Sequence, residues 1–256
     1  MKRPFRFGTT PPIDVPAPPV PAAAPATADA GVESVLGMAL KDKFSRVYEN
    51  NVFGGSVSRS GEGSDLVQTA VIRREIPALL SELGIQTFLD APCGDWYWMQ
   101  HVHLPVKRYI GVDIVDALIV KNQTLFGNEH ISFQCANLVR DNLPLSDLLF
   151  SRDCLVHLDF ADALAMLANF QKSGATYLLT TTFPGRVANK DLGNGFWQPL
   201  NMQVPPFSFP EPLRLINEGC TEGNNMFTDK CLGLWRLADL PLDGGGRDQK
   251  SPTISS

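Results

Sequence analysis

The sequence lacks the features that mark membrane proteins, secreted proteins and general nucleic-acid binders. No segment approaches the roughly 18 consecutive apolar residues of a membrane span, and the N-terminus has no apolar signal region. Basic residues are the minority, with 22 Lys and Arg against 27 Asp and Glu and a net charge of −5. We therefore expect a soluble, cytoplasmic protein with no membrane partner and no nucleic-acid partner.

Cysteine is scarce, with five residues in a chain of 256. These cysteines lie in separate apolar segments, form no C-x-x-C pair, and show no zinc-like spacing to the four histidines. The pattern predicts reduced, buried thiols and no metal site.

Proline and alanine are concentrated at the N-terminus. Residues 1–30 hold eight prolines and seven alanines without apolar periodicity, so we expect a disordered segment. The basic opening MKRPFRF leaves organelle targeting open as an alternative to a cytoplasmic location. Residues 242–256 are rich in glycine and polar side chains and predict a flexible tail. A single domain over 31–241 remains for the fold.

Helix-like and strand-like patterns alternate through this domain. Helices are expected over 33–48, 66–83, 94–102, 116–126 and 160–171. Five strands are expected over 86–90, 107–114, 131–135, 147–151 and 175–183, and two further strands, joined by a hairpin-like turn, over 213–220 and 230–237. The alternation predicts an α/β fold, a Rossmann-like doubly wound sheet that is mostly parallel and closes with an antiparallel pair.

Two acidic residues end neighbouring predicted strands. Asp90 ends the first strand and is followed by Gly94, which permits close backbone approach, and by Asp95. Asp113 ends the second strand, 19 residues after Gly94. An acid at about this spacing is placed to accept both hydroxyls of an adenosine ribose, because ligands bind beyond the carboxyl ends of parallel strands.

The turn after the first strand has one glycine and lacks the G-x-G-x-x-G pattern that a dinucleotide pyrophosphate needs. A nicotinamide-dependent enzyme is therefore the less favoured alternative. S-adenosylmethionine has no phosphate, and its ammonium and sulfonium cations suit carboxylates such as Asp90 or Asp95. The charges favour S-adenosylmethionine as the cofactor.

Several segments resemble the class I S-adenosylmethionine-dependent methyltransferases, and in particular an uncharacterised branch with a DAPCGDWxWM first motif. They span roughly residues 44 to 237 in the same order and read GGSVSRSGEGSDLVQT, DAPCGDWYWM, YIGVDI, FSRDCLVHL, YLLTTTF and WQPLNMQVPPFSFPEP. The resemblance implies a seven-stranded sheet with an antiparallel last strand. It also implies methyl transfer to an acceptor.

The resemblance also implies positions for the cofactor. The loop from Asp90 to Asp95 would hold the methionine part, Asp113 the ribose, and Asn137 would lie beside adenine. The full predicted cofactor set is Asp90, Ala91, Cys93, Gly94, Asp95, Asp113, Ile114, Asn137, Leu138 and Arg152. The sequence departs from the family pattern at Pro92, where the first glycine is usual, and at Asn137, where a carboxylate is common, although an amide oxygen still accepts from the adenine amine.

The fourth strand leads into SRDCLVH, which supplies the candidate catalytic residues. His157 is the convenient general base and Asp153 the convenient group to orient an amine or hydroxyl. The alternative interpretation is that His157 packs or caps the next helix, since a base is optional for methyl transfer.

Two polar or aromatic segments are candidates to complete the pocket. Residues 50–64, the lid loop, are too polar and glycine-rich for a core, and we expect Ser60, Gly61 and Ser64 to lie over the cofactor. Residues 196–210 follow the fifth strand and place Trp197 and Asn201 where substrate could be selected. A proline-rich arm that only covers the sheet is the alternative for the second segment.

The sequence thus predicts a methyltransferase that acts on a small or medium-sized acceptor at oxygen or nitrogen. The alternative from another class is a catalytically silent domain that binds S-adenosylmethionine and serves as an interaction module.

Overall fold

A computed structural model of the 256-residue chain describes residues 39–242. The predicted N-terminal segment 1–30 lies outside these residues, as does the predicted tail apart from Leu242. Within the described part of the chain, no helix is both long enough and apolar enough to span a membrane.

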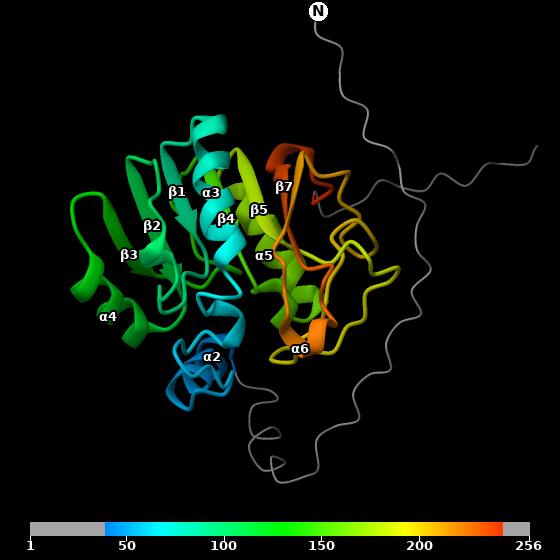
Figure 1. Ribbon diagram of the computed structural model, residues 1–256, viewed down its shortest axis with the longest axis horizontal. Helices are drawn as coiled ribbons and strands as arrows, with labels where there is room; N and C mark the ends of the chain where they lie inside the picture. The colour runs from blue at the N-terminus through cyan, green and yellow to red at the C-terminus, as the bar shows by residue number, and fades with distance from the viewer. Residues whose placement is uncertain (1–38, 243–256) are drawn as a thin grey trace, which may run out of the picture.

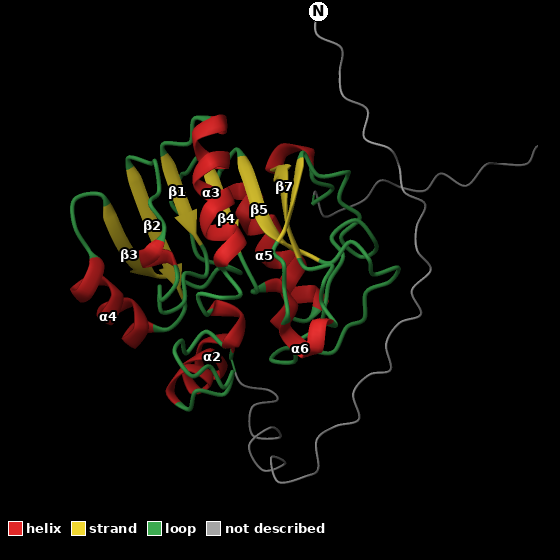
Figure 2. Cartoon of the chain, viewed as in Figure 1, coloured by secondary structure: helices red, strands yellow, loops and turns green. Residues whose placement is uncertain are grey.

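Seven strands form one sheet in the order β3-β2-β1-β4-β5-β7-β6, shown in Figure 2. The first five, which run parallel, are β1 (Thr87–Asp90), β2 (Arg108–Asp113), β3 (Ile131–Cys135), β4 (Leu148–Ser151) and β5 (Tyr177–Thr182). The last two, β6 (Arg214–Asn217) and β7 (Cys231–Arg236), pair antiparallel, and β7 also pairs antiparallel with β5. The predicted fold class and all seven predicted strands are confirmed.

Helices cover both faces of the sheet (Figure 1). Apolar side chains of α3 (Ala70–Leu83) and α4 (Asp116–Phe126) pack in one core cluster, whose largest members include Phe88 and Phe150. Those of α5 (Phe160–Lys172) pack in a second cluster on the opposite face, together with residues 200–209 and Trp235. Burial on both faces explains why the strands carry near-continuous apolar runs.

The segment that follows β5 covers the sheet rather than forming a helix. Leu200, Met202, Phe207 and Phe209 are buried against the α5 face. Six prolines between 184 and 212 are incompatible with a regular helix there. This arrangement matches the alternative of a proline-rich covering arm.

Helix α2 (Leu40–Glu49) and the lid loop lie beyond the carboxyl ends of the strands (Figure 1). Residues 33–38 of the helix predicted over 33–48 lie outside the described part of the chain. In the described part, this helix begins at Leu40. The helix predicted over 66–83 begins only at Ala70, because the Asp65 carboxylate accepts hydrogen bonds from the backbone N–H groups of Val67 and Gln68 at 2.7 Å each and holds a turn instead.

The helix predicted over 94–102 is wrong. The segment consists of turns and a short 3-10 helix, Met99–His101. Trp96 has a φ of +57°, which breaks a right-handed helix, and the Asp95 carboxylate accepts from the N–H of Tyr97 in a local turn.

The cysteines are all free, but they are not all buried. Cys93, Cys220 and Cys231 are buried and Cys154 is half-buried, whereas Cys135 is exposed at the end of the edge strand β3. The prediction of buried thiols is therefore wrong for Cys135, since an edge strand has one side open to solvent.

Candidate functional site

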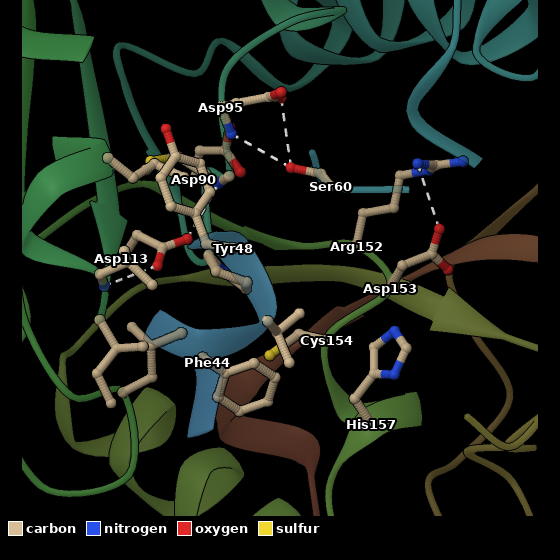
Figure 3. Close-up of a pocket in the computed structure, with 18 of the residues that line it drawn as sticks. Phe44, Tyr48, Ser60, Asp90, Asp95, Asp113, Arg152, Asp153, Cys154 and His157 are labelled. Carbon is tan, nitrogen blue, oxygen red and sulfur yellow. Dashed lines mark hydrogen bonds and ion pairs between the residues drawn. The ribbon is translucent and has the colours of Figure 1, made fainter. Parts of the chain in front are cut away.

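A deep cavity opens at the carboxyl end of the sheet, between the strand tips and the segment formed by α2 and the lid loop. It encloses about 1140 Å³ of empty space, counting the part open to solvent. Its walls come from the ends of β1, β2 and β4, from the segment after β3, and from α2 and α5. Figure 3 shows side chains from these elements pointing into one space.

Asp90, at the end of β1, is buried and accepts a short hydrogen bond from the hydroxyl of Tyr109. Burial raises the pKa of Asp90 to about 8, although the Tyr109 hydroxyl partly opposes this shift. No cation described in the structure forms a salt bridge with this carboxylate. A cationic ligand group beside Asp90 would be stabilised by it and would lower its pKa.

Asp113 ends β2 and lies at the same edge of the sheet. Its two carboxylate oxygens accept from backbone N–H groups, Oδ1 from Val115 at 3.0 Å and Oδ2 from Gly94 at 3.2 Å. Burial nonetheless raises the pKa of Asp113 to about 6. Each oxygen keeps a lone pair for a further donor, as recognition of two hydroxyl groups requires.

The segment after β3 supplies a mixed wall. Asn137, Leu138 and Val139 all line the cavity, as does Ile114 after β2. The Asn137 side-chain oxygen accepts from the N–H of Val139 at 2.9 Å, which fixes the turn. The wall thus combines the apolar side chains of Ile114, Leu138 and Val139 with one polar side chain, Asn137.

The lid loop is tied to the turn after β1 through Asp95. The Asp95 carboxylate accepts from the Ser58 hydroxyl at 2.9 and 3.1 Å and from the Arg59 N–H at 2.8 Å. The backbone N–H of Asp95 in turn donates to the Ser60 hydroxyl at 3.2 Å, as Figure 3 shows. Asp95 thus fastens the loop over the cavity, where Ser60 and Ser64 line the wall.

Gly94 makes this close approach possible. Its φ is +52°, in the left-handed region, and a Cβ atom at this position would collide with the Ser60 hydroxyl. The glycine of the first turn therefore serves the contact with the lid loop as well as the bend of the turn.

A network of charged side chains lies at the other end of the cavity, below the tips of β4, β6 and β7. Arg152 pairs with buried Glu218 at 2.7 Å and with Asp153 at 3.3 Å, and it also donates to the carbonyl of Gly63 at 2.9 Å. Lys230 pairs with Asp153 at 2.6 Å. Burial alone would raise the pKa of Asp153, but Lys230 and Arg152 outweigh it and lower the pKa to about 2.

His157 lines the cavity beside Asp153 and stacks on Phe53 of the lid loop, with ring centroids 4.6 Å apart. Burial lowers the pKa of His157 to about 4, against a smaller opposing effect of Asp153. The imidazole is therefore neutral at physiological pH, and its Nδ1 is buried without a hydrogen-bond partner.

The apolar wall of this second end comes largely from residues that the sequence analysis did not single out. Phe44 projects from α2, Phe53 from the lid loop, and Leu158 and Met166 from the start and middle of the α5 region. Tyr48, also on α2, lies beside Asp90 and Asp113 at the first end in Figure 3. The spacing of Phe44 and Tyr48 is that of an ordinary amphipathic helix, so only the placement of α2 over the strand tips shows that they line the cavity.

The structure brings together most of the predicted site residues. The following all line the cavity: Asp90, Cys93, Gly94, Asp95, Asp113, Ile114, Asn137, Leu138, Arg152, Asp153, His157, Ser60 and Ser64. Ala91 is buried in the core of the α5 face instead, and Gly61 lies against Phe53 within the lid loop.

Trp197 and Asn201 do not line the cavity. Trp197 packs on Phe183 and Phe227, with ring centroids 5.8 and 4.5 Å away. Asn201 donates to the carbonyl of Arg186 at 2.8 Å and fixes a loop. Their surroundings make both of them part of the covering arm.

No family model and no curated protein matches the sequence. Among solved structures, the fold is similar to human N-acetylserotonin methyltransferase in complex with SAM, with 15% identity and a TM-score of 0.54 over 78% of this chain and 60% of that chain. It is also similar to a Burkholderia thailandensis 1,6-didemethyltoxoflavin-N1-methyltransferase with bound 1,6-didemethyltoxoflavin and S-adenosylhomocysteine, with 16% identity and a TM-score of 0.51 over 84% and 93%.

N-methyltransferase NodS from Bradyrhizobium japonicum matches at 19% identity over 43% of this chain and 61% of that chain, with a TM-score of only 0.36. At these identities the likeness concerns the fold. The chain therefore has the Rossmann-like fold of S-adenosylmethionine-dependent methyltransferases, and it spans about three fifths of the human enzyme's length.

Proposed function

We propose that the protein is an S-adenosylmethionine-dependent methyltransferase. The observation that carries the proposal is the pair of buried carboxylates, Asp90 and Asp113, at neighbouring strand tips of one cavity. Neither forms a salt bridge with a described residue, and burial raises the pKa of both. Such acids are costly to the fold and are typical of binding sites.

The hydrogen-bond acceptors of the cavity fit this cofactor. Asp90 offers a carboxylate to an ammonium group and Asp113 offers two oxygens to vicinal hydroxyls. Asn137, Ile114 and Leu138 line the same cavity, and we assign the adenine to them. No lysine lines the cavity in the described part of the chain, and Arg59 and Arg152 already bond to protein groups. A pyrophosphate would meet carboxylates instead of cations, which favours a phosphate-free adenosine derivative.

When bound, S-adenosylmethionine supplies an electrophilic methyl group on a sulfonium. The protein's contribution is then to hold the acceptor in line and to exclude water. The lid loop, fastened by Asp95, covers the cavity, and Phe53 of this loop stacks on His157 in the cavity wall. His157 is a weak base at a pKa of about 4, so we assign it mainly to positioning.

Calorimetric titration of the full chain with S-adenosylhomocysteine tests the proposal. We expect saturable one-to-one binding, and no binding of a reduced nicotinamide cofactor under the same conditions. Absence of S-adenosylhomocysteine binding by folded protein would contradict the proposal. Native mass spectrometry of freshly purified protein provides an independent check, because a tightly held adenosyl ligand would add its mass to the chain.

The catalytically silent alternative differs in turnover only. Transfer of a labelled methyl group from S-adenosylmethionine to any member of an acceptor panel would exclude it. Tight binding without transfer across amines, phenols and acids would favour it.

A further inference from the structure

The cavity has two chemically different ends. Asp90, Asp113 and Asn137 line the first end, which we have given to the cofactor. The second end lies between α2, the lid loop and the segment after β4. We define the acceptor pocket as Phe44, Phe53, Asp153, Cys154, His157 and Met166, of which Figure 3 labels four.

Apolar and aromatic side chains make up most of the acceptor pocket. Phe44 projects from α2 and Phe53 from the lid loop, and the Phe53 ring lies nearly parallel to His157 at an interplanar angle of 28°. Because the two rings stack on each other, they form one aromatic wall, and an apolar, aromatic lining favours a ring-bearing acceptor over a highly polar one.

Asp153 is the one ionised group of the acceptor pocket among the described residues. Its Oδ2 is engaged by Lys230 and Arg152, whereas its Oδ1 makes only a 3.5 Å contact with the Thr181 hydroxyl. Asp153 also has a φ of +53°, an uncommon conformation for a residue with a side chain. Asp153 lines the cavity, and its Oδ1 can accept a further hydrogen bond.

Among residues 39–242, this pocket offers no unpaired cation as a counterion for an anionic acceptor. The arginines of the cavity wall are both engaged, Arg152 by Glu218 and Asp153, and Arg59 by the carbonyls of Tyr48 and Glu49. Lys230 pairs with Asp153 and does not line the cavity. His157 is neutral, and Arg152 and Lys230 are already paired, so a carboxylate or phosphate on the acceptor would lie beside the Asp153 carboxylate with no cation of its own.

We infer that the acceptor is an amine carried on a flat apolar ring, whose N–H group donates to the free oxygen of Asp153. This inference rests on the proposed function and names the substrate class of the same site. Transfer to such a nitrogen forms an N–C bond and breaks the C–S bond of the donor, whose electron pair stays on sulfur. One proton leaves the nitrogen for water.

Matched ring compounds bound to the full chain saturated with S-adenosylhomocysteine test this inference. The probes are phenethylamine, hydrocinnamate and ethylbenzene, together with tryptamine, indolepropionate and ethylindole. Each set keeps the ring and changes only the polar end from amine to acid to hydrocarbon. We expect calorimetry to show at least one amine binding about tenfold more tightly than its matched acid, as a hydrogen bond to a charged group implies.

The Asp153→Asn variant should reduce this preference to less than about threefold. Because this change leaves buried Lys230 with less compensation, the double variant Asp153→Asn with Lys230→Met serves where the single variant unfolds. Glu129→Gln, at an exposed position, is the matched control and should keep the wild-type preference.

Acids that bind as tightly as the amines, an amine preference that survives Asp153→Asn, or no amine binding at all would each overturn the inference. In these cases retained S-adenosylhomocysteine binding leaves the methyltransferase proposal intact. Loss of S-adenosylhomocysteine binding by the wild-type chain would overturn both.

Discussion

The two ends of the cavity handle buried charge in opposite ways. At the tips of β1 and β2, Asp90 and Asp113 have no cationic partner in the described chain, and burial raises the pKa of each. At the tips of β4, β6 and β7, Arg152, Lys230, Asp153 and Glu218 pair with one another. The carboxyl groups of the first end therefore remain available to a ligand, whereas the charged groups of the second end mostly pair with one another and hold the strand tips together.

This contrast makes stability and binding separable. Removing a paired charge from the network leaves its partner buried and uncompensated, which destabilises the fold. Removing a carboxylate that has no cationic partner should weaken ligand binding more than it destabilises the fold. Five predictions test the contrast.

The largest expected effect is that of Glu218→Gln on stability. The Glu218 side chain is 1% exposed, and besides the salt bridge its two oxygens accept from Nε of Arg152 at 3.3 and 3.1 Å. Loss of its charge should lower the free energy of unfolding by about 3 to 5 kcal/mol, measured by urea denaturation. Glu129→Gln, the exposed control, should change it by no more than about 0.5 kcal/mol. Equal effects of the two variants would show that the network contributes nothing specific.

Asp113→Ala should act on binding. Loss of the ligand hydrogen bonds should weaken S-adenosylhomocysteine binding by about 1.5 to 3 kcal/mol, measured by calorimetry. The free energy of unfolding should fall by less than it does for Glu218→Gln, because the lost bonds to the N–H groups of Val115 and Gly94 are partly offset by no longer burying a carboxyl group with a raised pKa. An unchanged dissociation constant would remove Asp113 from the site.

Ser58→Ala should loosen the lid loop. The Ser58 hydroxyl donates to both oxygens of Asp95, so its removal should speed S-adenosylhomocysteine dissociation by about tenfold, as loss of a partly exposed bond to a charged group implies. Stopped-flow displacement measures this rate. Ser81→Ala, which removes an exposed hydroxyl in α3, should leave the rate unchanged, and an equal effect of both would argue against the lid.

The smallest expected effect is a pH dependence of binding. Asp113 has a pKa of about 6 in the folded protein against an ordinary value of 3.8, so its ionised fraction falls as the pH drops below 6. A ligand that donates to the carboxylate should bind progressively more weakly below that pH, by up to about tenfold per unit. Calorimetry between pH 5 and 8, values set about the cited pKa, measures this trend, and Asp113→Asn should reduce it. A wild-type profile that is flat across this range would contradict the assignment.

The free energy of unfolding of the ligand-free protein, measured by urea denaturation, should also depend on pH, and the two ends of the cavity should contribute with opposite signs. A carboxyl with a raised folded pKa is ionised more readily in the unfolded chain, so Asp113 and Asp90 favour folding at low pH and oppose it once the pH passes their unfolded values. Asp153, with a lowered pKa of about 2, contributes stability above its unfolded value of 3.8 and loses it as the pH falls toward 2.

The sequence sufficed for the sheet because burial on both faces imposes long apolar runs on each parallel strand. It also located Asp90 and Asp113, since the carboxyl ends of neighbouring parallel strands meet at one edge. The segment 94–102 failed because aromatic spacing that suits a helix was overridden by the positive φ of Trp96 and the local bonds of Asp95. Local periodicity cannot report such competition.

The acceptor end was less accessible to sequence reasoning. Phe44 on α2 and Met166 on α5 are far apart in the chain, and only the fold brings both of them to one cavity. Trp197 and Asn201 were predicted to contact substrate, but they pack within the covering arm. Aromatic residues after a strand do not distinguish a pocket wall from a packed cover.

A crystal structure of the protein with S-adenosylhomocysteine would show directly whether Asp90 and Asp113 hold the cofactor. We expect the ribose hydroxyls to lie within hydrogen-bonding distance of the Asp113 carboxylate, with the amino-acid end of the ligand toward Asp90. A ligand bound elsewhere, or bound in this cavity with no donor near Asp113, would contradict it.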